Sequence, residues 1–249
     1  MNEIYDFCIV ITTYNRPDML IKLLDSITEQ KKDYKIFITV FDDGSTLKYD
    51  ISKYNVKKIG MSPNQGKKKF WRIIDMSFKY LKNINSKYFI YMQDDISLVD
   101  NFFDILKDTY NRIEDEKKIA LSFLTDSRVT KPNWTDFNPV VLGDIIKTQW
   151  VELHFICEKP FLETLEYKIE PIPTNRWDND PNLSSGVGWQ ITNRLFNNGL
   201  NMYHTKKTLV HHGNHESKMN KNERIKNKLR KKIREMVRTV VINKKFKTK

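Results

Sequence analysis

The stretch KYFIYMQDD, residues 87–95, joins an apolar run directly to two adjacent carboxylates. Lys87–Met92 predicts a buried strand, and Asp94 and Asp95 stand just past its end. Two neighbouring carboxylates at a strand end repel each other unless a cation lies with them. Such hard oxygen ligands suit Mg²⁺ or Mn²⁺, which also bind substrate phosphates. The alternative is an acidic turn that caps a helix starting near Asp100.

The surrounding sequence alternates between strand-like and helix-like segments over its first 125 residues. Further strands are predicted from apolar runs at residues 7–12, 34–41, 56–59 and 119–124. Apolar residues at helical spacing predict helices over residues 17–27, 70–81 and 101–113. This rhythm is typical of an α/β fold with a mostly parallel sheet flanked by helices.

Three polar clusters follow predicted strands, namely Thr12–Arg16, Asp42–Ser45 and Gln93–Asp95. In an open parallel α/β sheet, ligands bind beyond the carboxyl ends of the strands. Turns after strands are commonly polar, so one cluster would carry little weight. Three of them, two with adjacent carboxylates, indicate a binding site at this edge of the sheet.

The motifs in these clusters are similar to those of a known enzyme family. IVITTYNRP (residues 9–17), VFDDGS (40–45), an Asn-x-Gly turn (64–66) and QDD (93–95) occur in the order and spacing of GT-A glycosyltransferases of the family 2 type. The sequence resembles that family over roughly residues 5–125. The resemblance implies a GT-A fold and a glycosyltransferase of the hexosyltransferase type. Such an enzyme moves a sugar from a nucleotide-sugar, here a UDP-sugar, to an acceptor hydroxyl with inversion.

The resemblance also implies roles for individual residues. It places Asp42 or Asp43 on the base of the nucleotide and Asp94 and Asp95 on ribose and metal, the metal being Mn²⁺ or Mg²⁺. The form QDD instead of D-x-D leaves the division of roles between Asp94 and Asp95 open. The other residues expected to line the donor site are Thr13, Tyr14, Arg16, Asn64, Gly66 and Lys67.

The C-terminal half offers histidines as further metal ligands. The family places a histidine after a late strand, and His211 and His212 follow the strand-like Thr208–Val210. Successive strand residues face opposite ways, so at most one of the two is expected to be a ligand.

The catalytic base is harder to place from the sequence. An inverting transfer needs a group that takes the proton of the acceptor hydroxyl. The acidic pair that the family carries before a helix is missing at Gly186–Leu195. The nearest carboxylates, Asp178 and Asp180, are therefore the candidate base, and a simple turn at this point is the alternative.

Residues 1–219 are expected to form one GT-A domain, with a nucleotide-sugar half (1–125) and an acceptor half (126–219). Residues 220–249 predict a basic amphipathic helix and tail. The formal charge of +12 would attract nucleic acid, anionic lipid or phosphorylated substrates, although an AT-rich genome would also produce a Lys-rich chain.

Composition narrows the class and location of the protein. At 39% hydrophobic and 12% aromatic residues, the chain can form a packed core, so a disordered protein is not expected. Two cysteines, Cys8 and Cys157, in apolar runs indicate a reducing compartment. We find no signal peptide and no apolar run of membrane-spanning length, so a cytoplasmic protein is expected, with binding to the inner membrane face as a further option.

Three hypotheses for the function stay open, and the first two differ in the acceptor. The first is a surface glycan or lipid-linked saccharide, with residues 220–249 on an anionic membrane surface. The second is a hydroxymethylated base in phage-type DNA, where the same segment would neutralise phosphates. The third is a non-enzymatic, basic nucleic-acid-binding protein, which would give Asp94 and Asp95 no role.

Overall fold

The computed structural model describes residues 4–61, 63–64, 66–124, 138–151, 153–180 and 183–212. The expected boundary between the two halves, at residues 125 and 126, lies outside this part of the chain. The expected amphipathic helix and tail, residues 220–249, fall wholly outside it.

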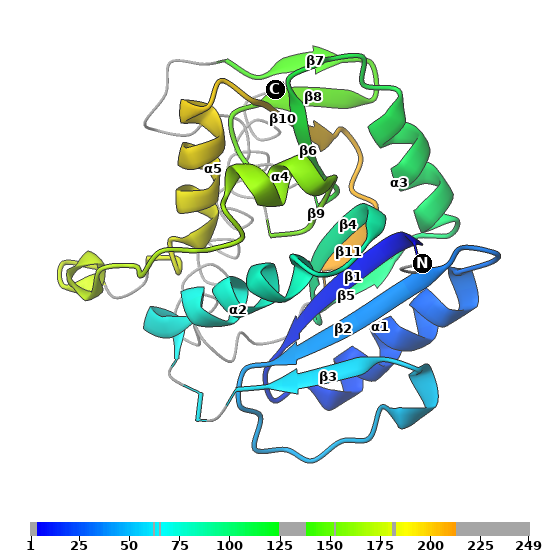
Figure 1. Ribbon diagram of the computed structural model, residues 1–249, viewed down its shortest axis with the longest axis vertical. Helices are drawn as coiled ribbons and strands as arrows, with labels where there is room; N and C mark the ends of the chain where they lie inside the picture. The colour runs from blue at the N-terminus through cyan, green and yellow to red at the C-terminus, as the bar shows by residue number, and fades with distance from the viewer. Residues whose placement is uncertain are drawn as a thin grey trace, which may run out of the picture.

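A mixed sheet of nine strands forms the centre of the molecule, in the order β3-β2-β1-β4-β9-β6-β10-β8-β7 (Figure 1). Its first half is parallel: β1 lies between β2 and β4, and β3 extends the sheet beyond β2. The strands of this half are β1 (Tyr5–Thr13), β2 (Ile36–Asp42), β3 (Lys57–Gly60) and β4 (Ser86–Gln93). The predicted parallel α/β sheet is confirmed here.

The second half of the sheet is largely antiparallel. β9 (Phe155–Cys157) lies between β4 and β6 (Lys118–Ser122) and is antiparallel to both. Beyond β6, the sheet continues through β10 (Asn201–Thr205), β8 (Ile145–Thr148) and β7 (Val140–Leu142). Before β9, the described chain is not paired into the sheet at Val151. At Val151 the backbone N–H donates to Thr192 Oγ1 of a helix instead of to a strand.

Helices cover both faces of the sheet (Figure 1). One face buries the apolar side of α1 (Pro17–Gln30) and α3 (Phe102–Asn111). The other face buries α2 (Trp71–Leu81), α4 (Lys159–Thr164) and α5 (Val187–Asn197). Short 3₁₀ turns are η1 (Ser52–Tyr54), η2 (Lys67–Lys69) and η3 (Thr174–Trp177).

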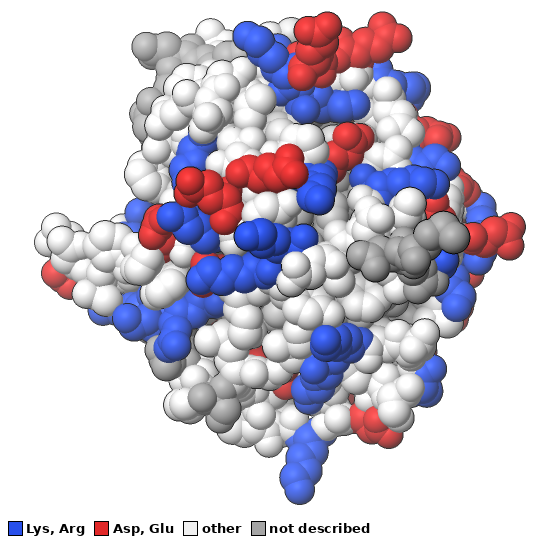
Figure 2. All heavy atoms as spheres, in the orientation of Figure 1, with Lys and Arg blue, Asp and Glu red and all other residues white. Residues whose placement is uncertain are grey.

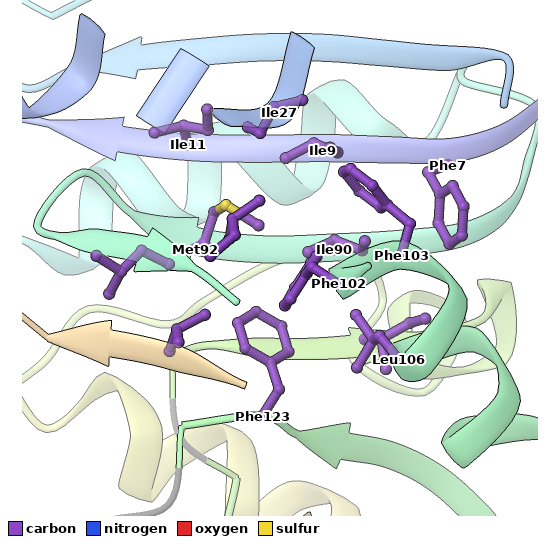
Figure 3. Packing of buried hydrophobic residues seen from close by; sticks show 14 of the residues in the cluster. Phe7, Ile9, Ile11, Ile27, Ile90, Met92, Phe102, Phe103, Leu106 and Phe123 are labelled. Atoms are coloured by element: carbon purple, nitrogen blue, oxygen red, sulfur yellow. The ribbon is translucent and has the colours of Figure 1, made fainter. Parts of the chain in front are cut away.

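The core under α3 shows how the strands that end at the site are held. Figure 3 shows Phe102 and Leu106 of α3 pointing toward Ile90 and Met92 of β4. Phe123, which follows β6, packs edge-on against Phe102 with ring centroids 5.2 Å apart. Fully burying side chains of this size stabilises a fold by roughly 1.5–3 kcal/mol each. The carboxyl end of β4 is therefore held in place by this packed core.

A two-stranded ribbon, β5 (Ile96–Leu98) with β11 (Val210–His212), follows the end of β4. Asp94 and Asp95 form the turn between β4 and β5, so the alternative in which they cap the next helix is excluded. α3 starts later, at Phe102, and the N–H of Phe102 donates to Gln30 Oε1 at 3.0 Å. The predicted strand at Thr208–Val210 is displaced, because Val210 is where pairing with β5 begins.

Candidate functional site

Three strands, β1, β2 and β4, end side by side and carry the predicted donor-site residues. Thr13 is the last residue of β1 and pairs with Asp42, the last of β2. On the other side, the N–H of Asp94 donates to the carbonyl of Thr12 at 3.1 Å. The parallel register therefore brings the first and third polar clusters of the sequence together, as the sequence predicts.

Asp94 is fully engaged by its neighbours. Its Oδ2 accepts a hydrogen bond from Thr13 Oγ1 at 2.6 Å, and its Oδ1 lies 3.2 Å from Arg16 Nη1. Burial raises the pKa of Asp94 to about 6, against the opposing effects of Thr13 and Arg16. A carboxylate with both oxygens bonded is held in one orientation, at the junction of β1 and β4.

Asp95 differs from Asp94 in having an unused oxygen. Its Oδ2 is 2.7 Å from Arg16 Nη1 and 3.4 Å from His212 Nε2. Its Oδ1 is buried and has no hydrogen-bond partner among the described residues. Burial disfavours the charge, yet the charges of His212 and Arg16 outweigh it and lower the pKa of Asp95. Asp95 is thus an ionised carboxylate with one oxygen available to a ligand.

The ribbon explains how a histidine near the end of the described chain reaches this carboxylate. β11 pairs antiparallel with β5, and His212 lies opposite Ile96, the residue after Asp95. His211 pairs with Ser97 one position along, so its side chain faces the other way. Of the two predicted histidines, the structure brings His212 to the aspartates.

Asp42 and Asp43 at the end of β2 also differ in their partners. Oδ1 of Asp42 accepts from the Ser45 N–H at 2.8 Å, and Oδ2 accepts from Tyr49 Oη at 2.7 Å and lies 3.3 Å from Lys58 Nζ. Through these contacts Asp42 stabilises the turn that follows β2. Asp43 instead accepts from Asn64 Nδ2 at 2.8 Å through Oδ2.

The contact between Asp43 and Asn64 joins the motif at residues 40–45 to the Asn-x-Gly turn at residues 64–66, so that both line the same side of the site. Asn64 Nδ2 also donates to the Asp43 carbonyl at 2.7 Å, and Asn64 Oδ1 accepts from the Gly66 N–H at 2.8 Å. Gly66 has a φ of +71°, a conformation that glycine adopts without strain, and Lys67 starts η2 directly after it. Burial, together with the charge of Asp42, raises the pKa of Asp43 to about 6.

Tyr14 and Arg16 lie on the turn between β1 and α1, with Asn15 between them. Asn15 has a φ of +51°, its N–H donates to Ser45 Oγ at 2.8 Å, and its Oδ1 accepts from the Thr46 N–H at 2.8 Å. This turn is therefore fixed to the Asp42–Ser45 turn. Pro17 at the start of α1 then sets the helix direction.

The two candidate base residues lie on a different segment. Asp178 and Asp180 are exposed and follow η3. Trp177 is buried beneath Lys68, whose Nζ lies 5.9 Å from the centre of its ring, so this segment adjoins η2. The first turn of α5 carries no acidic residue, which agrees with the missing acidic pair.

A residue that the sequence did not single out also belongs to this region. His154 is 4% exposed, precedes β9, and interacts electrostatically with both Asp95 and His212. A single histidine inside an apolar run gives no sequence signal of its own. Its place follows only from the insertion of β9 between β4 and β6.

The side chains of Asp95 and His212 could bind a divalent cation whose remaining ligands come from a substrate and water. In the described ranges, no group of three or more His, Cys, Asp and Glu side chains could hold a metal ion by itself. The buried, unbonded Oδ1 of Asp95 and the nearby imidazole of His212 nevertheless offer two ligands. Mg²⁺ or Mn²⁺ bound by few protein ligands completes its shell with waters and substrate phosphates.

Two further features of the described residues concern the cysteines and the helices. Cys8 and Cys157 are buried and free. None of the helices in this part of the chain is long and apolar enough to cross a membrane.

Several solved structures have a similar fold. S. aureus TarS 1–349 in complex with UDP-GlcNAc matches with a TM-score of 0.55 and 15% identity over 86% of this chain and 60% of that one. A Pyrobaculum calidifontis mannosyltransferase in complex with GDP-Man and Mn²⁺ matches with 0.50 and 14%, over 80% and 54%. Glucosyl-3-phosphoglycerate synthase from Mycobacterium tuberculosis, with Mn²⁺ and UDP, matches with 0.52 and 12%, over 85% and 73%.

At these identities the similarity shows the fold alone. The chain spans 60% of the TarS fragment and 54% of the mannosyltransferase. No curated protein matches the sequence. The sequence model of glycosyl transferase family 2, however, matches residues 8–138, more than half of the chain and all the motifs at the ends of β1, β2 and β4. The chain therefore belongs to glycosyl transferase family 2.

Proposed function

We propose that this protein transfers a sugar from a UDP-sugar to an acceptor hydroxyl, with Mn²⁺ or Mg²⁺ bound at Asp95. The observation that carries the proposal is the asymmetry between Asp94 and Asp95. Asp94 has both oxygens bonded to the protein, whereas Asp95 keeps a buried oxygen without a described partner. A buried, ionised carboxylate oxygen is costly unless a cation or a donor reaches it. Three structures of similar fold support this assignment: one is named with UDP-GlcNAc, one with GDP-Man and Mn²⁺, and one with UDP and Mn²⁺.

The chain's own residues divide the work of holding the donor. In this proposal, Asp43 binds the nucleobase, while Asp42 holds the turn through Tyr49 and Lys58. Thr13 and Arg16 orient the Asp94 carboxylate toward the ribose. Tyr14, Asn64 and Gly66 form the surrounding wall, and Lys67 adds positive charge beside the diphosphate.

The cation would be held by Asp95 and His212, with the diphosphate as the remaining ligand. Its chemistry there is that of a Lewis acid, which stabilises the charge that develops on the leaving diphosphate. Arg16 contributes to the same stabilisation, since its guanidinium already bridges the two carboxylates.

The acceptor proton requires a base, and we propose Asp180 or Asp178 for this role. Support comes from the position of their segment, which adjoins η2 through the Lys68–Trp177 contact. Substitution to Asn would lower sugar transfer by the roughly 10²–10⁴-fold typical of general bases and leave UDP binding intact. If each single variant and the double variant retain wild-type transfer, the base lies elsewhere.

The acceptor class is proposed to be a surface glycan or lipid-linked saccharide, with inversion at the sugar. Modified DNA bases are the competing acceptor, and an incubation with each acceptor and radiolabelled UDP-sugar separates them. NMR of the anomeric configuration in the product would test inversion.

The donor proposal is tested by nucleotide binding. UDP should bind more tightly with Mn²⁺ present, and calorimetry should show that Asp95→Asn removes this increase. Asp144→Asn is the matched control, because Asp144 is an exposed aspartate on the turn between β7 and β8, ion-paired to Arg112 at 2.6 Å. Equal Mn²⁺ dependence in the wild type and Asp95→Asn, or no Mn²⁺-dependent UDP binding at all, would refute the proposal.

A further inference from the structure

Arg16 places a permanent positive charge against the two carboxylates that follow β4. Its Nη1 lies 2.7 Å from Asp95 Oδ2 and 3.2 Å from Asp94 Oδ1, so one terminal nitrogen bridges both side chains. Among the described residues, Arg16 is the arginine or lysine that pairs with these aspartates. A guanidinium stays protonated at every pH at which a protein is normally studied. The protein itself therefore neutralises half of the charge of the two carboxylates.

The bridge is held in place and largely shielded from water. The side chains of Arg16, Asp94 and Asp95 are only 13%, 3% and 5% exposed. The carbonyl of Arg16 accepts from the Leu20 N–H at 3.1 Å, and Pro17 begins α1 directly after it. The backbone that carries the guanidinium is thus fixed by the helix. Charges so little screened by solvent act strongly on any further ion that enters the site.

A divalent cation at Asp95 would meet this like charge. Oxygen ligands hold Mg²⁺ at about 2.1 Å, so an ion on either oxygen of Asp95 would be no more than roughly 7 Å from Arg16 Nη1. Repulsion between a single and a double positive charge at that distance weakens binding by about a factor of ten even in water, and by more in a buried site. The ion would also change the three side chains from a net negative to a net positive group.

A diphosphate would supply the negative charge that balances both cations. Arginine suits this role, because its planar fork matches two phosphate oxygens. Asp94 has a second partner in Thr13 Oγ1 at 2.6 Å, and Asp95 has one in His212 Nε2 at 3.4 Å. Arg16 can therefore share its charge with a phosphate without leaving either carboxylate unpartnered.

We infer that Arg16 makes cation binding conditional on the nucleotide. Arg16 opposes a divalent cation at Asp95 when no diphosphate is bound, and it binds the diphosphate together with the cation when one is. This inference rests on the proposed function, since it presumes both a cation at Asp95 and a nucleoside diphosphate donor. Its consequence is that the site accepts the metal and the nucleotide as a pair far better than it accepts the bare ion.

Three dissociation constants of the full chain test the inference. Electron paramagnetic resonance of free Mn²⁺ gives the Kd for Mn²⁺ alone, and calorimetry gives the Kd for UDP with and without saturating Mn²⁺. Arg16→Gln removes the charge and keeps an N–H donor. We expect this variant to bind Mn²⁺ alone at least about 10-fold more tightly than the wild type, and UDP with Mn²⁺ at least about 10-fold more weakly. Because coupling is reciprocal, the factor by which Mn²⁺ tightens UDP binding should fall by a similar amount.

Two further variants separate the charge at this position from charge in general and from the bridging geometry. Arg112→Gln is the matched control, because Arg112 is 61% exposed and ion-paired at 2.6 Å to Asp144, away from the donor residues in the sequence and on the surface. It should leave all three constants unchanged. Arg16→Lys retains the charge without the planar fork, so its Kd for Mn²⁺ alone should stay within about 3-fold of the wild-type value. Thermal unfolding shows whether each variant is folded.

The outcomes distinguish this inference from the proposed function. If the wild type shows no Mn²⁺-dependent UDP binding, both fail. If it does, and Arg16→Gln binds Mn²⁺ alone no more tightly than the wild type, only the role of Arg16 is overturned, because the bridge then merely holds the carboxylates. Equal tightening in Arg112→Gln would also overturn it, as an effect of overall charge. Should Arg16→Gln not fold, Arg16→Lys decides: a Kd within the threefold range supports the inference, and a larger change overturns it.

Discussion

Asp43 is a carboxylate that the fold buries beside a second carboxylate, Asp42. Only 7% of Asp43 is exposed, and Asn64 donates to it at 2.8 Å. Because burial and Asp42 raise its pKa to about 6, the folded state holds the Asp43 proton more tightly than the unfolded chain does. Asp43 therefore adds stability at low pH that is lost as the pH rises through about 6. A donor site built around such a group sacrifices stability at neutral pH.

Replacing Asp43 by Asn should reverse that loss. The amide keeps the shape and can still accept from Asn64, but it cannot ionise. We expect Asp43→Asn to be more stable than the wild type by up to about 2 kcal/mol above pH 6, with the advantage disappearing toward pH 4. Urea unfolding at pH 4.5 and 7.5 measures this difference. A stability gap of the same size at both pH values would contradict the raised pKa.

The sequence could place these aspartates at the end of a strand but could not divide their roles. Asp42 is bonded to Tyr49 and ion-paired with Lys58, which follow it by seven and sixteen residues in the sequence. Lys58 reaches Asp42 because β3 pairs with β2, and no local pattern announces that contact. Asp94 and Asp95 present the same difficulty, because their difference depends on Thr13 and on His212 of a distant strand.

At the scale of elements, the turn after β2 packs against the segment before η2 at Gly44. Gly44 has a φ of +78°, and a Cβ there would lie 2.5 Å from the backbone nitrogen of Asn64 and 2.8 Å from the Met61 carbonyl. Both neighbours are backbone and cannot move aside cheaply. Only glycine permits this close approach, which holds Asn64 against Asp43.

Gly44→Ala should therefore separate the two segments. We expect it to cost more than about 2 kcal/mol and to weaken UDP binding, since the left-handed backbone alone costs an alanine about 1–2 kcal/mol. Gly143→Ala is the control, with a φ of +66° and no atom within 4 Å of an added Cβ. Urea unfolding and calorimetry with UDP measure both effects. If the two variants lose equal stability and bind UDP alike, the close approach at Gly44 is unimportant.

Asp115 connects β10 and β8 to the segment that precedes β6. It accepts hydrogen bonds from Tyr203 Oη, from Asn201 Nδ2 at 2.7 Å and from the Lys117 N–H at 2.9 Å, and lies 3.4 Å from Lys147 Nζ. Burial opposes the charge, but these hydrogen bonds prevail and lower the pKa of Asp115 to about 2. The ionised form thus adds stability above pH 4 that is lost as the pH falls toward 2.

Asp115→Asn should cost about 1–2 kcal/mol at pH 7, a figure discounted because one fifth of the side chain is exposed. The loss should shrink below pH 4, and urea unfolding across this range would show it. Asp144→Asn should change stability little, because that aspartate and its partner Arg112 are both about 60% exposed. Equal losses in the two variants would show that Asp115 is no more than a surface ion pair.

The parallel strands were predictable as elements because each is a continuous apolar run bounded by polar residues. The pairing of the antiparallel half was not predictable. β9 has three residues, and its insertion between β4 and β6 depends on non-local pairing that periodicity does not encode. The strands β5, β8 and β10 were not predicted, for the same reason. This topology sets His154 beside Asp95, which explains why the donor residues could be anticipated and the residue behind them could not.

At the scale of the whole molecule, charge is distributed very unevenly along the chain. Residues 220–249 contain 13 of the 43 Lys and Arg residues and two of the 31 Asp and Glu residues, so they carry +11 of the net +12. The rest of the chain is close to neutral. Figure 2 agrees with this, since acidic side chains are interspersed with basic ones over the upper part of the visible face. Attraction to a polyanion should therefore reside in residues 220–249.

Deleting residues 220–249 separates this attraction from the donor site. The truncated chain keeps every residue from Thr13 to His212, so Mn²⁺-dependent UDP binding should persist. Its affinity for vesicles containing anionic lipid should fall by at least about 10-fold, because each Lys or Arg near such a surface contributes about 1 kcal/mol. Vesicle co-sedimentation at low and high salt measures this, with neutral vesicles as the control. The same truncation assayed on duplex DNA tests the other polyanion, where binding should lose most of its salt dependence. If neither affinity changes, the positive charge of this segment serves no anionic surface and the Lys-rich composition alone accounts for it.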